Sequence, residues 1–259
     1  DDADTLATFD KAVFGHIGFM LSNIVRTTWL SVTNGRIAFA PKGPCKRYMK
    51  QLTRFSSAFA LLSDVMMAVL GADLKRRERI SARLGDILSY LYIATSVIKH
   101  YNDEGKHRED LPLVHWACQD ALFKIQTAFQ DILNNMKPRI VARIMSEWIF
   151  PFGARLKAPS DQLDHKISNL LMNPTNARER LSADVSGFGN TDVTRLEETL
   201  QAVMGIESVE KTVTKAGKEG ELDGYSLKEW IQSALDKDMI TKEQYQAWQM
   251  ADKLRADII

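Results

Sequence analysis

A long apolar seam with α-helical spacing constrains the fold of this chain more than any other sequence feature. It begins at Ile80, within a cluster of five basic residues in nine positions, and it advances in alternating steps of four and three residues. This spacing keeps the apolar side chains on one face of a helix for about six turns. The seam consists of Ile80, Leu84, Ile87, Leu91, Ala94, Ile98 and Tyr101. The segment therefore predicts a long helix whose apolar face another element must cover.

Three further segments have the same character, and together they predict a helical bundle. The segment before the basic cluster has a matching seam, formed by Leu52, Phe55, Phe59, Leu62, Met66 and Val69. Because a short link at 71–73 separates the two seams, we expect helices at 45–71 and 75–104 to fold back on each other. A first helix at 4–31 and a fourth beginning at Asp110 complete the set. The helix at 4–31 should carry the following residues along one side: Phe9, Val13, Ile17, Leu21, Ile24 and Thr28.

The chain changes character after Pro138, where the predicted helices become shorter. They fall near 140–150, 160–172, 175–181 and 192–216, with a loop at 186–190 and two last helices after Ser226 and Thr241. The first turns of those two match capping boxes. No segment has the alternating pattern of a strand. We therefore predict an all-α protein, with a bundle of four long helices at 1–137 followed by a tail of shorter helices at 138–259, packed on or beside it.

Composition narrows the classes of protein. The 34 basic and 33 acidic residues nearly balance, which argues against nucleic-acid binding driven by bulk charge. Two distant cysteines, Cys45 and Cys118, exclude a disulfide scaffold and favour a reducing compartment. No apolar run is long enough to predict a membrane span, and no signal peptide is visible. Because the chain opens on Asp1 without Met, we expect a fragment of a larger, cytoplasmic protein.

The sequence contains no recognisable catalytic or metal-binding constellation. Gly187 and Gly189 lack the third glycine of a dinucleotide fingerprint and any strand before them. Asp161, Asp164 and His165 share one helix face, but acidic residues commonly occupy the first turn of a helix. We therefore predict no catalytic residue and no metal ligand, and cofactor-binding residues remain unknown.

The basic cluster is the first candidate for a contact surface. It comprises Lys75, Arg76, Arg77, Arg79 and Arg83. Five cations at a helix hinge suit docking to an acidic partner surface or a phosphate. The alternative is a solvated turn with Glu78 and Asp86 as local partners. Both interpretations stay open at this point.

The second candidate is an aromatic segment, formed by Trp148, Ile149, Phe150 and Phe152. Arg155 and Lys157 follow it, and apolar side chains beside cations are typical of a segment that lies on a membrane surface. The alternative is a corner that fills the joint between the bundle and the tail. The sequence does not decide whether these side chains face lipid or core.

Four sequence blocks resemble the C-terminal region of the large bacterial fatty acyl-CoA dehydrogenases. They are the residues at 74–89, 110–116, 149–153 and 158–165. They occur in the order in which the family carries them, and the surrounding helices are similar too. Beyond Leu181 no block is recognised.

The resemblance implies a flavoenzyme of fatty-acid β-oxidation. Such enzymes hold FAD and convert a fatty acyl-CoA to a trans-2-enoyl-CoA, with a glutamate that takes the α-proton and a flavin N5 that takes the β-hydride. The glutamate and the flavin contacts belong to the upstream part of the family's chain, and no motif for them matches here. The resemblance thus implies FAD in the parent enzyme and none in this fragment.

Two interpretations of function follow. In the first, the chain is a non-catalytic helical domain that packs on the upstream dehydrogenase core, with peripheral contact to the inner membrane as an open possibility. In the second, it is a free-standing helical adaptor that binds a partner helix. A dehydrogenase core directly upstream in the parent chain would favour the first interpretation.

Overall fold

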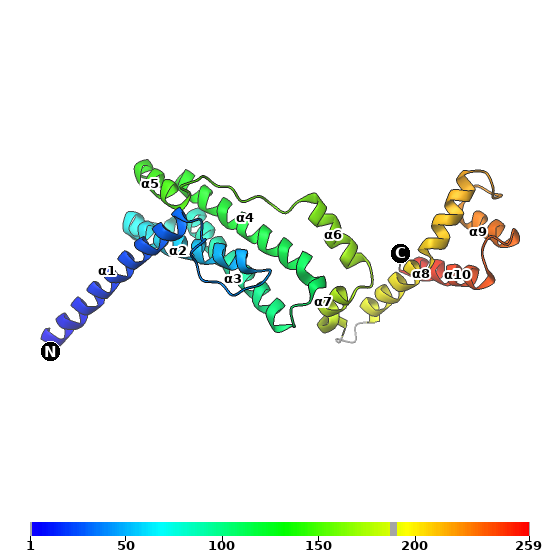
Figure 1. The fold of residues 1–259 in the computed structure, drawn as a ribbon, viewed down its shortest axis with the longest axis horizontal. Coiled ribbons are helices and arrows are strands. Elements are labelled where there is room, and N and C mark those ends of the chain that lie inside the picture. The colour runs from blue at the N-terminus through cyan, green and yellow to red at the C-terminus, as the bar shows by residue number, and fades with distance from the viewer. Residues whose placement is uncertain (1, 187–190, 259) are drawn as a thin grey trace. The chain divides into compact units, whose positions relative to one another are not determined.

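The computed structural model describes residues 2–186 and 191–258, and it confirms the predicted all-α class. Within these residues there are ten α-helices, two 3-10 helices and no strand (Figure 1). The predicted loop at 186–190 lies outside the described residues except for Ser186, which is the last residue of a helix.

The chain forms two compact units, Asp1–Ile167 and Ser168–Ile259. The sequence pattern placed the division at 137/138. The first unit extends further because Ile149 and Phe150, at the end of the fifth helix, are buried in the core of the bundle. That core therefore needs residues from both sides of Pro138.

The first unit contains the predicted long helices. They are α1 (Asp2–Val32), α2 (Lys46–Leu70), α3 (Glu78–Asp103) and α4 (Leu111–Asn135), followed by α5 (Arg139–Ile149) and α6 (Asp161–Met172), which continues into the second unit. Two 3-10 helices, η1 (Gly71–Arg76) and η2 (Arg108–Asp110), form the connections on either side of α3. Lys75 and Arg76 thus lie in a 3-10 turn and not in the helix that the pattern predicted.

The seam of α3 is buried as expected. Its members are inaccessible except Leu84, which is half-buried against the core. Helices α3 and α4 run antiparallel, since Arg83 faces Asp131 near one end and Tyr90 faces Lys124 further along. Helix α2 contacts α1, α3 and α4, and so forms the centre of the bundle.

Three aromatic rings form the middle of this core. Phe55 of α2 stacks on Phe129 of α4 with ring centroids 5.8 Å apart, and Phe150 meets both rings at 6.3 and 6.1 Å. The Phe129–Phe150 pair is edge-to-face, an arrangement that aromatic pairs favour beyond the area they bury. The corner after α5 is therefore part of the bundle.

The segment Lys46–Arg76 is long and apolar enough to cross a membrane by length and composition alone, although the sequence pattern predicts no span. In the described structure 39% of its apolar window is buried. The segment buries Phe55, Leu62 and Met66 against neighbouring helices, and it also buries Arg54 and Asp64 in polar contacts.

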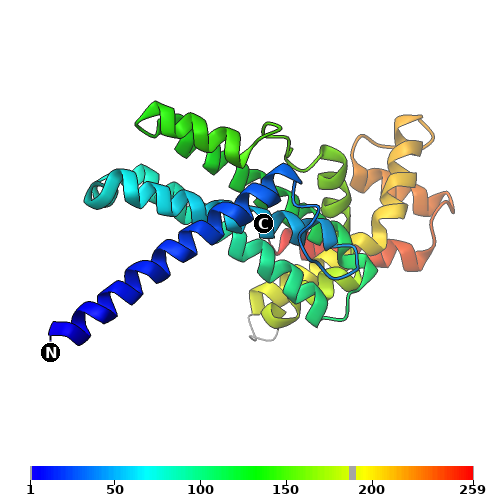
Figure 2. The same ribbon diagram turned by 60° about the vertical axis from the view of Figure 1, so that its left-hand side comes forward.

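Helix α1 packs differently from the prediction. The polar stripe Asn23, Thr27 and Ser31 is buried against α2, with Asn23 Nδ2 donating to Asp64 and Thr27 Oγ1 donating to the Ser57 carbonyl at 3.0 Å. The predicted apolar side, from Phe9 to Leu21, is exposed. Figures 1 and 2 both show the N-terminal half of α1 extending beyond the other helices of its unit.

The second unit has its own apolar core. Its helices are α7 (Asn176–Ser186), α8 (Thr191–Lys218), α9 (Leu227–Asp236) and α10 (Lys242–Ala256). Ile206, Val213, Ile231 and Trp248 are buried between the last three. Thr241 forms the predicted capping box with Gln244.

The other predicted capping box forms only in part. Ser226 accepts from the Glu229 amide as a cap should, but the Glu229 carboxylate accepts from the Tyr225 amide instead of the Ser226 amide.

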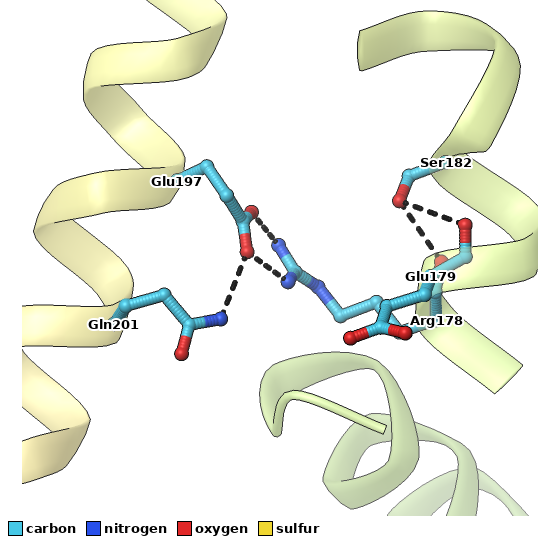
Figure 3. A network of polar contacts seen from close by, with 5 residues as sticks. All are labelled: Arg178, Glu179, Ser182, Glu197 and Gln201. Atoms are coloured by element: carbon cyan, nitrogen blue, oxygen red, sulfur yellow. Dashed lines mark hydrogen bonds and ion pairs between the residues drawn. The ribbon is translucent and has the colours of Figure 1, made fainter. Parts of the chain in front are cut away.

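A polar network joins α7 to α8 (Figure 3). The Arg178 guanidinium donates to both carboxylate oxygens of Glu197, at 2.6 Å for Oε1, and Gln201 donates to the same carboxylate at 3.1 Å. These hydrogen bonds hold the pKa of Glu197 below its usual value. A bidentate arginine–carboxylate pair fixes the orientation of the two side chains as well as their distance, so it holds α7 against α8.

We expect Gly217→Ala to destabilise the chain and Gly205→Ala in the same helix to stabilise it. A Cβ at Gly217 would lie 2.3 Å from Cδ2 of Trp230, whereas a Cβ at Gly205 would meet nothing within 4 Å. The clash should cost about 1–3 kcal/mol, while alanine in the open site should gain up to about 1 kcal/mol. Denaturant unfolding of both variants measures the difference. Equal midpoints would contradict this packing of α8 on α9.

Candidate functional site

The basic cluster lies at the turn between α2 and α3. Lys75, Arg76, Arg77 and Arg79 are exposed. The Arg76 guanidinium is 3.9 Å from Asp73, and the half-buried Arg83 is 3.9 Å from Asp131. Ion pairs this long and this exposed neutralise little charge. The turn therefore presents a basic surface, and both interpretations of it remain compatible with its geometry.

The structure gives three of the four residues of the aromatic segment a place inside the bundle. Trp148 is half-buried, and its indole Nε1 donates to Thr28 Oγ1 of α1 at 2.8 Å. Ile149 and Phe150 are buried, whereas Phe152 is 51% exposed. The geometry favours the corner interpretation for the first three, and Phe152 alone is left for contact with a membrane or a partner.

Arg54 of α2 is the residue on which this corner rests, and the sequence analysis did not single it out. Arg54 is 6% exposed, and its guanidinium carbon lies 4.8 Å from the Phe55 ring centroid and 5.9 Å from that of Phe150. Nη2 donates to the Ile149 carbonyl at 2.7 Å, and Nη1 donates to Gln51 Oε1 at 3.2 Å. Burial lowers the pKa of Arg54 to about 10. The sequence signal that could have identified this residue is an arginine placed between the apolar seam positions Leu52 and Phe55.

A cavity of about 770 Å³ adjoins Arg54. Phe150, Phe152 and Arg155 line it from the corner after α5, and Arg36 lines it from the loop after α1. Among the described residues that line it, none is acidic. The cavity therefore contains no carboxylate that could take a proton from an acyl-CoA, and we assign no dehydrogenation step and no flavin site to it.

Of Asp161, Asp164 and His165, which share the first turns of α6, Asp164 makes a tertiary contact. The Trp116 indole donates to Asp164 Oδ1 at 2.6 Å and thereby ties α4 to α6. Within residues 2–186 and 191–258, no three His, Cys, Asp or Glu side chains are grouped to hold a metal ion.

The sequence blocks that carry the family resemblance contact structural partners. The block at 110–116 meets the block at 158–165 through Trp116 and Asp164. The block at 149–153 supplies the carbonyl that Arg54 holds, and the block at 74–89 forms the α2–α3 turn and the first part of the buried seam. All four blocks thus contribute to the packing of the bundle.

The described residues form an all-helical domain with exposed basic and apolar side chains on its surface. Over residues 1–259 the chain matches the family model described as acyl-CoA dehydrogenase, C-terminal, bacterial type, and it belongs to that family. The resemblance is thereby confirmed, and the family implies a dehydrogenase core in the same polypeptide. No solved structure matches the chain.

We expect Phe150→Ser to destabilise the chain by several kcal/mol and Phe152→Ser to change stability by less than about 1 kcal/mol. The first removes a buried ring from the aromatic core, and losses of this kind cost about 3–5 kcal/mol. The second alters a half-exposed ring, and it serves as the matched control. Thermal melts of the two variants test the corner interpretation. A Phe150→Ser variant as stable as the unmutated chain would contradict it.

Proposed function

We propose that this chain is the non-catalytic C-terminal domain of an FAD-dependent acyl-CoA dehydrogenase of fatty-acid β-oxidation. The parent enzyme converts a fatty acyl-CoA to a trans-2-enoyl-CoA, with FAD bound in its catalytic core. The domain packs on that core and stabilises it. Family membership supports the oxidoreductase parent.

The observation that carries the docking proposal is the apolar surface of α1. Ten large apolar side chains of this helix are exposed: Leu6, Phe9, Val13, Phe14, Ile17, Phe19, Leu21, Val25, Trp29 and Val32. They lie on more than one face, and a helix that is apolar nearly all round is normally buried. Exposed apolar surface of this extent marks a binding site. The family description supplies a partner in the same polypeptide, the dehydrogenase core.

A free-standing adaptor remains the second candidate function, because α1 would equally suit a partner helix from another protein. The core of the same chain is favoured because it is covalently linked and therefore present at high effective concentration. For the whole enzyme we propose a cytoplasmic location, with Phe152 and the basic cluster as the surfaces available for a peripheral contact with the inner membrane.

Replacing Phe9 and Phe14 together by Ser should lower the melting temperature of the parent enzyme and leave that of the isolated 259-residue chain unchanged. The two rings are 63% and 70% exposed here, so their removal costs this unit little, whereas a docked core would lose both contacts. Parallel thermal melts of the two proteins measure this.

A second set of replacements tests whether the basic cluster docks on the core in addition to α1. The triple change Arg76→Ala, Arg77→Ala and Arg79→Ala should destabilise the parent only if the basic cluster also docks. If the parent melts unchanged with the Phe9 and Phe14 replacements, α1 is not the docking surface.

The purified 259-residue chain should carry no flavin, while the parent enzyme should show flavin absorbance near 1:1 stoichiometry. The reason is that no flavin-binding motif of the family matches this sequence, and none of the described residues that line the arginine cavity is acidic. Absorbance scans of both proteins, before and after addition of FAD, make the comparison. A stoichiometric flavin spectrum from the isolated chain would refute the assignment of FAD to the core.

A further inference from the structure

The buried guanidinium of Arg54 lacks a counter-ion. No ion pair joins it to a carboxylate among the described residues, and its two hydrogen-bond partners, Gln51 and the Ile149 carbonyl, are neutral. Its Nε has no partner at all. Removing a charge from water without a compensating charge is costly, and proteins usually pair such groups. A bound anion would supply the negative charge that the Arg54 guanidinium lacks.

The cavity of about 770 Å³ beside Arg54 has the charge to receive one. Arg54 lies at its inner side, and the exposed arginines Arg36 and Arg155 line it from two different loops. With no acidic residue in the lining, the three guanidiniums give the cavity a formal charge of +3. Apolar side chains, among them Ile37 and Phe152, line other parts of it.

The loop after α1 is held in place as one wall. Gln51 connects it to Arg54, because the Gln51 amide donates to the Asn34 carbonyl at 2.9 Å while its oxygen accepts from Arg54. Gly35 follows with φ +74°, and a Cβ there would lie 3.0 Å from the Lys50 carbonyl oxygen. The turn that carries Arg36 is therefore pressed closely on α2.

The corner after α5 is held in the same way. Gln126 of α4 binds both backbone groups of Leu156, accepting from its amide at 2.9 Å and donating to its carbonyl at 3.1 Å. Arg155 donates from Nε to the Phe152 carbonyl at 2.6 Å. The two outer arginines thus sit on fixed backbone, as a preorganised binding site requires.

We propose that this cavity binds a phosphate monoester carried on an apolar or aromatic body. A phosphate monoester carries between one and two negative charges at neutral pH and offers several acceptor oxygens, which suits three guanidiniums better than a single carboxylate does. The apolar lining receives the organic part of the ligand. Of the ten side chains of the docking surface on α1, Val32 is the one that also lines this cavity.

Phenyl phosphate is the probe, and isothermal titration of the 259-residue chain at low salt is the measurement. Binding should weaken about tenfold or more when Arg36 and Arg155 are both changed to Gln, since each loses charge-assisted hydrogen bonds. Arg143→Gln, an exposed arginine of α5 outside the cavity, is the matched control and should leave binding unchanged. Arg54→Met keeps the side-chain volume and should abolish binding.

Benzoate and benzyl alcohol complete the experiment. Benzoate should bind at least about tenfold more weakly than phenyl phosphate, and benzyl alcohol should not bind. If Arg54→Met fails to fold, the two outer arginines decide the question, because both side chains are exposed. Equal binding of benzoate, no binding of phenyl phosphate, or equal loss in the Arg143→Gln control would overturn the proposal.

Discussion

The contact between Arg54 and the end of α5 is the interaction on which the first unit depends. A buried arginine in the central helix holds the last carbonyl of α5 and lies against two of the three rings of the aromatic core. This contact brings the chain after Pro138 back onto α2, and it turns the segment around Phe150 from a possible linker into part of the core. It also leaves a positive charge without a counter-ion among the described residues, beside a cavity that two further arginines line. One contact thus shapes both the fold and the candidate anion site.

The two halves of helix α1 differ in what their side chains contact. Its C-terminal half is attached to α2 by the buried polar groups Asn23 and Thr27, which specify register because each hydrogen bond needs one partner. Its N-terminal half presents apolar side chains that no part of the described chain covers. The proposed docking role needs both properties: a helix that is packed on its own domain, and an exposed apolar surface that can bind a second domain.

Family membership and local chemistry agree on what this chain contributes to an acyl-CoA dehydrogenase. The blocks that carry the resemblance are occupied with structural contacts, such as Trp116 with Asp164. Contacts of this kind fix the shape of a domain. The proposed role as a stabilising, docking domain follows from that distribution.

The sequence by itself determined the all-α class, the long helices, the buried seam of α3 and the capping box at Thr241, because periodicity and capping are local properties. It also carried the family resemblance. Tertiary structure alone decided that the apolar side of α1 stays exposed, since periodicity tells which residues share a face but not which element covers that face. Tertiary structure likewise decided that Arg54 is buried and binds the Ile149 carbonyl. The carbonyl that this arginine binds is 95 residues away in the chain, and no local pattern reports a contact over such a separation.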